Sequence, residues 1–122
     1  MPRRDIRMSG EEVTAFLAGH SCCVIGYNDG GPAPAVLTGS YEFAEGALRV
    51  SVPQPTRAGA ALRADPRVCV IVEQSPSYYQ IAYVGLEGNA ERISDTAGPL
   101  AFDLTPSTFT SASFAKLAEP AD

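Results

Sequence analysis

The chain has 122 residues, of which 45% are hydrophobic and 19% charged, and its formal net charge is −5. This length suits one domain, so we expect a single domain over residues 1–122. Lys116 is the only lysine, and a chain this acidic lacks the basic face of a non-specific nucleic-acid binder. Ten prolines and eleven glycines interrupt the chain at short intervals, which disfavours a helical bundle and favours strands joined by turns.

The N-terminal residues and the cysteines indicate the cellular compartment of the protein. No apolar run is long enough to span a membrane, and residues 1–8 are charged rather than signal-like. Cys22 and Cys23 are adjacent on a predicted strand, so their side chains point to opposite faces and cannot easily be joined. Together with Cys69 they are expected to be buried thiols, which suits a reducing compartment. We therefore expect a cytoplasmic protein with no membrane partner.

The first predicted element is a short amphipathic helix. Ser9 and Glu12 have the spacing of a capping box, in which each side chain binds the backbone amide of the other residue. Val13, Phe16 and Leu17 follow at helical spacing, and Gly19 is a natural end. The pattern predicts a helix over residues 11–18.

The rest of the chain has the pattern of strands and turns, with one further helix. Asn28–Gly31 has the composition of a hairpin turn, and an alanine-rich helix begins after Thr56, which can cap it. Gly85 and Gly88 interrupt a long strand and indicate a bulge or a close approach of another backbone. The predicted strands are 22–27, 33–43, 47–52, 67–73, 79–92 and 100–104, the helix is 57–64, and a Ser/Thr-rich tail ends the chain.

The order of these elements predicts the fold class. Hairpins dominate, and there is no β-α-β alternation of the kind that builds a doubly wound parallel sheet. Closing an antiparallel sheet into a barrel removes the edges that these strands would otherwise expose. We expect a mainly β protein, an antiparallel barrel with short flanking helices.

The segment 51–57 carries the clearest signal for a ligand. A strand ends there, a proline-rich loop follows, and Thr56 and Arg57 stand at the start of a helix. Free backbone amides at a helix start attract an anion, and a guanidinium can bind a phosphate through two parallel hydrogen bonds. The alternative interpretation is an ordinary helix cap beside a solvated arginine.

Other candidate groups give weaker signals. His20, the only histidine, follows a helix, where a cation favours the helix dipole; a role as haem ligand is the alternative. A zinc site made of His20 and the three cysteines is disfavoured, because no C-x-x-C spacing occurs. Tyr78, Tyr79 and Tyr83 could flank a planar ligand or pack across strands.

Several segments, in matching order, resemble one known superfamily. The stretch TRAGAALRADPRV at 56–68, the strand VIVE ending at Glu73 and VGLEGNAER at 84–92 are similar to the pyridoxamine 5'-phosphate oxidase-like, FMN-binding split-barrel superfamily. IRMSGEEVTAFL at 6–17, LTP at 104–106 and TSASF at 110–114 resemble its actinobacterial flavin- and deazaflavin-dependent oxidoreductases. The resemblance covers nearly the whole chain.

This resemblance implies a cofactor held between two identical subunits. The family binds FMN or, as an alternative, a deazaflavin coenzyme of the F-420 type; haem is a further option. It places the cofactor phosphate at Thr56 and Arg57, and a residue near Tyr83 approaches from the partner subunit. The positions matching the family's cofactor site are Val36, Leu37, Thr38, Ser51, Val52, Thr56, Arg57 and Tyr83.

Two departures from the family pattern concern this site. Ala58 stands where relatives commonly have a lysine beside the arginine, and Ser40 stands where many have a large aromatic residue. The leading hypothesis is a flavin- or deazaflavin-dependent oxidoreductase, acting as a homodimer on an unidentified small molecule, with no catalytic acid or base and no metal site assigned. The alternatives are a non-catalytic split barrel that binds haem or flavin, and a degenerate barrel that serves as an interaction module.

Overall fold

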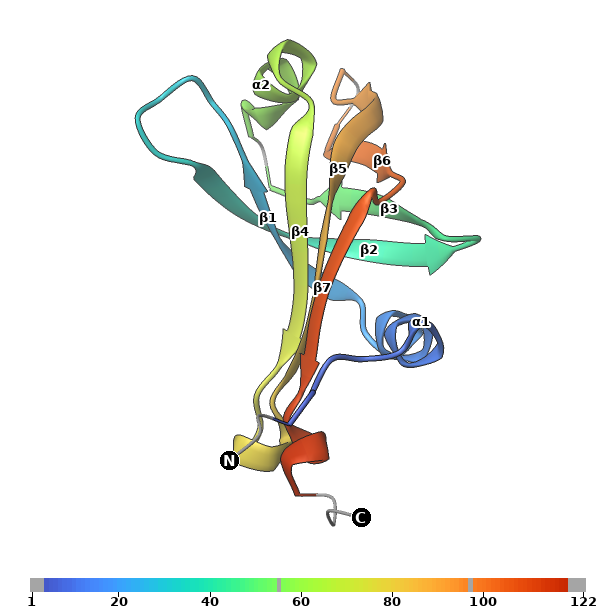
Figure 1. Ribbon diagram of the computed structural model, residues 1–122. Coiled ribbons are helices and arrows are strands. Elements are labelled where there is room, and N and C mark those ends of the chain that lie inside the picture. The colour runs from blue at the N-terminus through green and yellow to red at the C-terminus, as the bar shows by residue number, and fades with distance from the viewer. Residues whose placement is uncertain (1–3, 55, 97, 119–122) are drawn as a thin grey trace.

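The structure is a computed structural model that describes residues 4–54, 56–96 and 98–118. Within these residues it has seven strands, two α-helices and two short 3-10 helices (Figure 1). In chain order they are α1 (Gly10–Ala18), β1 (Cys22–Tyr27), β2 (Ala35–Ala44), β3 (Ala47–Val52), α2 (Ala58–Ala64), β4 (Arg67–Gln74), η1 (Tyr78–Gln80), β5 (Ala82–Ser94), β6 (Leu100–Leu104), β7 (Thr108–Ser113) and η2 (Phe114–Leu117).

The strands form one antiparallel sheet that closes on itself. Its order is β4-β1-β2-β3-β6-β5-β7, and β4 also pairs with β5, so six strands make a barrel. β7 pairs with β5 alone and extends the sheet beyond the barrel. Closure leaves β4 with a neighbour on both sides, β1 and β5.

The barrel interior is apolar, and the helices lie at its ends. Phe102, Leu48, Val70 and Leu86 are among the fully buried side chains that fill it. Figure 1 shows α2 at one end of the long strands and η1 and η2 at the other, with α1 beside the barrel. α1 buries Leu17, whose carbonyl oxygen accepts a 2.7 Å hydrogen bond from the buried hydroxyl of Tyr41.

The sequence predictions for most elements are confirmed. The capping box of Ser9 and Glu12 is present with both hydrogen bonds, at 3.2 and 3.0 Å. The strands predicted at 22–27, 47–52 and 100–104 have the predicted bounds. α2 begins at Ala58, one residue later than predicted, because Arg57 has left the helical conformation and takes the N-cap position.

Two predictions near the C-terminal half of the chain need correction. The Ser/Thr-rich tail contains a seventh strand, β7, whose first three residues are exposed and whose Ala112 is buried, and its polar, threonine-containing sequence suits the edge of a sheet. Residues 79–81 precede the strand rather than begin it, since Tyr78–Gln80 form the 3-10 helix η1. The close approach at Gly88 is confirmed, because a Cβ there would lie 2.9 Å from the carbonyl oxygen of Thr105, whereas at Gly85 the contacts would be ordinary.

No helix in the described part of the chain is both long and apolar enough to cross a membrane.

Candidate functional site

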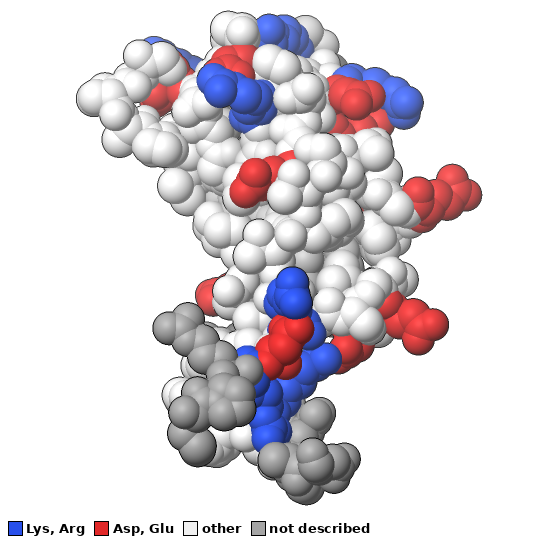
Figure 2. All heavy atoms as spheres, in the orientation of Figure 1, with Lys and Arg blue, Asp and Glu red and all other residues white. Residues whose placement is uncertain are grey.

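The outer face of the barrel over β2, β1, β4 and β5 carries unusually many apolar side chains. The strand registers place Thr38 beside Val24 and Val24 beside Ile71, so these side chains share that face. Val36 is 65% exposed and Ile71 40% exposed. Figure 2 shows few charged side chains across the middle of this face of the molecule: the Lys and Arg side chains are gathered towards the two ends, and separate acidic side chains lie between them. We call the side chains of Val24, Val36, Ile71 and Tyr83 the apolar face.

A hollow of about 460 Å³ opens beside the apolar face, where the end of β3 meets β2 and β1. Ile71 and Val24 supply its apolar wall, and Thr38, Ser40 and Gln54 supply groups that can donate or accept hydrogen bonds. Its remaining lining residues are Cys22, Cys23, Gly39, Pro53 and Glu73. A hollow of this size, lined by both apolar and hydrogen-bonding side chains, suits a planar small molecule.

The chain continues from this hollow into the corner predicted to bind an anion. Thr56 Oγ1 accepts a 3.1 Å hydrogen bond from the backbone amide of Ala58, so its O–H remains able to donate to a ligand. The side chain of Arg57 is exposed and makes no hydrogen bond or ion pair with any residue that the structure describes. The prediction that Thr56 caps the helix is wrong, because Arg57 takes the N-cap position and makes no side-chain cap hydrogen bond. Thr56 instead binds the first amide of the helix from the preceding position, which leaves both its hydroxyl hydrogen and the guanidinium of Arg57 available.

The other described arginines differ from Arg57, because each donates to an oxygen of the protein. Arg4 binds the backbone oxygen of Lys116, Arg7 binds Asp5, Arg49 and Arg92 bind Asp103, Arg63 binds Asp95, and Arg67 binds Asp65. Arg57 is thus the described arginine whose guanidinium has neither a hydrogen-bond partner nor a carboxylate among the described residues.

The comparisons with known proteins concern the fold. No protein-family model and no curated protein matches the sequence. A conserved hypothetical protein of Mycobacterium tuberculosis, 19% identical, superposes with a TM-score of 0.81 over 100% of this chain and 95% of its own. A FAD-binding protein of Mesorhizobium loti, 18% identical, gives 0.71 over 85% of this chain and 92% of its own. A Clostridium acetobutylicum protein of the pyridoxinephosphate oxidase family, related to general stress protein 26 and 14% identical, gives 0.71 over 84% and 87%.

The chain has the split-barrel fold. The resemblance found in the sequence is confirmed at this level, since its structural neighbours include flavin-binding and pyridoxamine-phosphate-oxidase-like proteins.

The barrel places the eight predicted cofactor positions differently. Val36, Thr38 and Tyr83 point outward from the apolar face, and Thr56 and Arg57 form the corner beside the hollow. Val52 is buried in the core and Leu37 packs against it, so only their backbones can meet a ligand. Ser51 is half-buried and lies directly across from Ser40 in the β2–β3 register.

The two departures from the family pattern have different structural consequences. The side chain of Ala58 is 1% exposed and points into the core, so a lysine at this position could not reach the corner without a rearrangement. Ser40 lines the hollow, and a large aromatic residue there would fill part of it. The hollow is therefore open at Ser40, the position where the family pattern has a large aromatic side chain.

Arg63 does not replace the missing lysine. It donates two hydrogen bonds to the carboxylate of Asp95, at 2.7 and 3.2 Å, and a third at 3.4 Å to the carbonyl oxygen of Ile93. The ion pair lowers the pKa of Asp95 below its usual value, so the carboxylate stays ionised. No local pattern predicts this pair, because the two residues are 32 positions apart.

The structure places His20 in a structural role. Its Nδ1 lies 2.7 Å from the carbonyl oxygen of Phe16 at the end of α1, and its Nε2 lies 3.1 Å from Oε1 of Gln74. Because both ring nitrogens have partners, His20 has none free to ligate a haem iron. No group of three or more metal-binding side chains occurs among the described residues.

The expectation of three buried thiols holds for one of them only. Cys23 is buried, and burial raises its pKa to about 11, whereas Cys69 is half-buried and Cys22 is exposed at the hollow. The adjacent pair does point to opposite faces, as strand alternation requires. All three cysteines are free.

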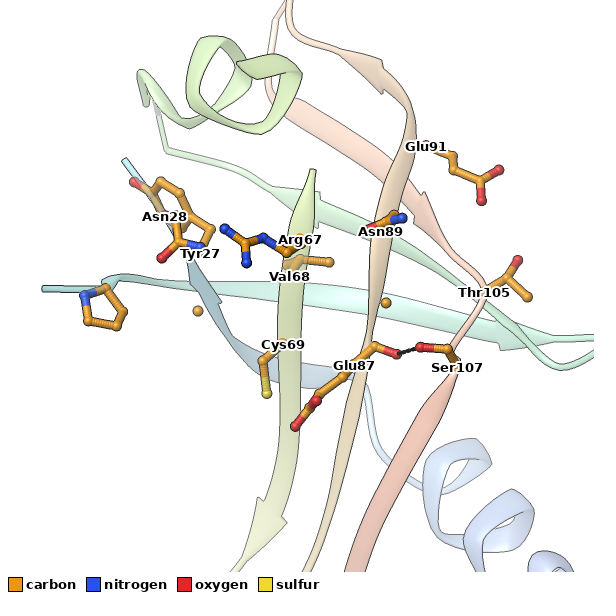
Figure 3. Close-up of a pocket in the computed structure, with 13 residues that line it drawn as sticks. Tyr27, Asn28, Arg67, Val68, Cys69, Glu87, Asn89, Glu91, Thr105 and Ser107 are labelled. Atoms are coloured by element: carbon orange, nitrogen blue, oxygen red, sulfur yellow. Dashed lines mark hydrogen bonds between the residues drawn. The ribbon is translucent and has the colours of Figure 1, made fainter. Parts of the chain in front are cut away.

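A second hollow of about 590 Å³ lies further along the apolar face, near the start of β4 (Figure 3). Cys69 and Glu87 lie side by side there, and the pKa of the Cys69 thiol is raised by burial and by this carboxylate. Arg67 reaches towards Tyr27 and Asn28 in this view. None of the eight predicted positions lines this hollow.

Proposed function

We propose that this chain is a flavin- or deazaflavin-dependent oxidoreductase acting on a small molecule. FMN is the simplest candidate cofactor, with a deazaflavin coenzyme of the F-420 type as the alternative. In this proposal Thr56 and Arg57 bind the cofactor phosphate, and the ring system lies in the hollow beside Thr38 and Ser40.

The observation that carries the proposal is the uncompensated guanidinium of Arg57. A chain with a net charge of −5 repels an anion unless a local cation holds it. Arg57 is such a cation, and a guanidinium can donate two parallel hydrogen bonds to a phosphate. The hydroxyl of Thr56, whose oxygen is already used by Ala58, can add a third donor.

The neighbouring hollow suits the ring of such a cofactor. Val24 and Ile71 offer an apolar surface against which a ring can lie, and Thr38, Ser40 and Gln54 offer hydrogen-bonding groups for its polar edge. A flavin or deazaflavin, when bound, supplies the hydride-transfer chemistry. The side chains of the hollow would orient the ring and exclude water from one of its faces.

A second copy of the chain would complete the site. The apolar face leaves Val36, Ile71 and Tyr83 exposed, and burying such side chains against another subunit is favourable at about 25 cal/mol per Å². In a two-fold dimer the same patch meets itself. Tyr83 of the partner subunit would then approach the ring, as the family resemblance implies.

Replacing Arg57 by alanine tests the phosphate assignment. A hydrogen bond to a charged group contributes about 1.5–3 kcal/mol, so we expect Arg57→Ala to weaken binding of FMN or the deazaflavin coenzyme by about tenfold to a hundredfold. Binding of riboflavin, which has no phosphate, should not change. Titration calorimetry on the two proteins with each compound measures this.

Arg7→Ala is the matched control, because it removes an exposed arginine from the opposite end of the molecule. Equal affinity of wild type and Arg57→Ala for FMN and the deazaflavin coenzyme would reject the assignment.

The absorption spectrum of the freshly purified protein separates the alternatives: a flavin spectrum supports the proposal, and a Soret band indicates haem. An interaction module would show no chromophore and no rise in melting temperature with any of these compounds.

A further inference from the structure

The strand β7 lies at the edge of the sheet, and one side of its backbone faces away from every other strand. The amide of Phe114 donates to the carbonyl oxygen of Ile81, at 2.9 Å, and this bond sets the alternation of hydrogen bonds along the β5–β7 ladder. The even-numbered residues of β7 therefore bond to β5, whereas the N–H and C=O groups of Phe109, Ser111 and Ser113 point away from it. We call these outward groups the free edge of β7.

The N-terminal segment covers only part of the free edge. The amide of Ser113 donates to the carbonyl oxygen of Ile6, at 2.8 Å, and the amide of Met8 donates to Oγ of Ser111, at 3.0 Å. The segment then leaves the edge, because α1 begins. Neither the N–H nor the C=O of Phe109 has a hydrogen-bond partner among the residues that the structure describes. Such a pair of groups fits an extended backbone, because one residue of a neighbouring strand accepts from the N–H and donates to the C=O.

A hollow of about 510 Å³ opens beside Phe109. Its walls come from β7, from α1 and from the end of the β2–β3 hairpin, and Figure 1 shows the last two on the same side of β7. Val13, Phe43 and Phe109 supply apolar surface, and Phe109 is 50% exposed. Arg7 is the one charged residue in the described lining, and the carboxylate of Asp5 binds its guanidinium. The hollow therefore suits an uncharged, apolar group.

The free edge and the hollow can be used by the same residue of a ligand. Phe109 pairs with Leu86, whose side chain is fully buried, so both side chains lie on the side of the sheet that faces the barrel interior. A residue that pairs with Phe109 from the free edge directs its own side chain to that side as well. Its backbone would meet the unpaired groups of Phe109 while its side chain enters the hollow.

We propose that the free edge of β7 and this hollow form a binding site for a short extended peptide segment with an apolar side chain. One residue of the segment exchanges two hydrogen bonds with the backbone of Phe109, and its side chain lies against the rings of Phe43 and Phe109. In this mode of binding, backbone hydrogen bonds give affinity and a side-chain pocket gives specificity. The site shares no residue with the proposed cofactor site, so it does not depend on the proposed function.

The probe for this site is N-acetyl-phenylalanine methylamide, a single residue with both backbone groups and an apolar ring. We expect saturable shifts of the amide signals of Phe109 and Ser111 in an NMR titration, and slower hydrogen exchange at the Phe109 amide when the probe is bound. The ester analogue, in which an oxygen replaces the N–H of the phenylalanine, keeps the ring but cannot donate to the C=O of Phe109. It should bind about tenfold more weakly.

Gly10→Phe fills the hollow from α1. A Cβ on Gly10 would meet nothing within 4 Å, so the variant should fold, and its ring should weaken binding of the probe at least about tenfold. Ala15→Phe is the matched control, because Ala15 is exposed on the same helix and does not line the hollow. It should bind the probe as the wild type does. Circular dichroism establishes that both variants are folded.

The proposal is overturned if the wild type shows no saturable binding, if Gly10→Phe binds the probe as tightly as the wild type, or if the ester analogue binds as tightly as the amide. A Phe109 amide that is already protected from exchange in the protein alone would also overturn it, since another segment or a second copy of the chain would then cover the edge. The ester comparison needs only the wild type, so it decides the matter even if Gly10→Phe does not fold.

Discussion

Replacing Ile71 by glutamate is expected to convert a dimeric protein into a folded monomer. Ile71 lies on the apolar face, 40% exposed in the single chain, with Val24 across from it on β1. Because a two-fold interface repeats each substitution, the variant would bury two unpaired carboxylates, and each unpaired buried charge costs several kcal/mol. We expect the dissociation constant of the dimer to rise at least about a hundredfold. Sedimentation velocity over a range of concentrations measures it.

Leu117→Glu is the control for this experiment. Leu117 is exposed to nearly the same extent, 38%, but belongs to η2 at the end of the molecule, away from the apolar face. It should leave the dimer intact. A wild type that sediments as a monomer, or an Ile71→Glu variant that remains dimeric, would contradict the proposed interface.

The same strand shows how far a sequence pattern predicts this fold. The segment 67–73 is apolar at nearly every position and therefore predicts a central strand, and β4 does have a neighbour on each side. Its second apolar side, which includes Ile71, is nevertheless exposed in the single chain. Local pattern specifies a strand that is apolar on both sides, but it does not say whether another element or another subunit covers the second side.

The candidate site was only partly predictable for a related reason. Thr56 and Arg57 are neighbours in sequence beside a helix start, so a local pattern could find them. Asp95 lies 32 positions from Arg63, with which it pairs, and it follows an irregular stretch in which the β5–β6 register shifts between Glu91 and Ser94 and Arg92 adopts a φ of 50°. Such irregularities depend on the packing of the whole barrel, and no local signal for them exists in the sequence.

The seventh strand, β7, was not predicted, because its sequence is polar. Residues 108–113 are polar and rich in threonine and serine, which led to the expectation of a tail. β-branched threonine favours extended backbone, and a strand with only one neighbour need not be apolar. β7 satisfies both conditions, since it pairs with β5 alone. Residue composition therefore fails to predict an edge strand that is held to the sheet mainly by backbone hydrogen bonds.

Truncating Phe102 is expected to cause the largest loss of stability. Phe102 lies on β6 with 0% of its side chain exposed and is among the largest fully buried side chains of the described barrel. Phe102→Ala removes its apolar contacts and leaves a cavity, and such changes lower the free energy of unfolding by about 3–5 kcal/mol. This is a large fraction of the roughly 5–15 kcal/mol that stabilises a typical domain. Urea unfolding followed by circular dichroism measures the shift in midpoint.

Phe109→Ala provides the comparison that isolates burial from residue type. Phe109, on β7, is 50% exposed, so the same substitution should cost less than about 1 kcal/mol. Both variants must be unfolded at one protein concentration, because association of subunits adds to the apparent stability. A difference between them of less than about 1 kcal/mol would mean that the barrel interior around Phe102 does not determine the stability of the fold. A difference of several kcal/mol would place the main stabilising contacts inside the barrel, which leaves the apolar face free to serve association.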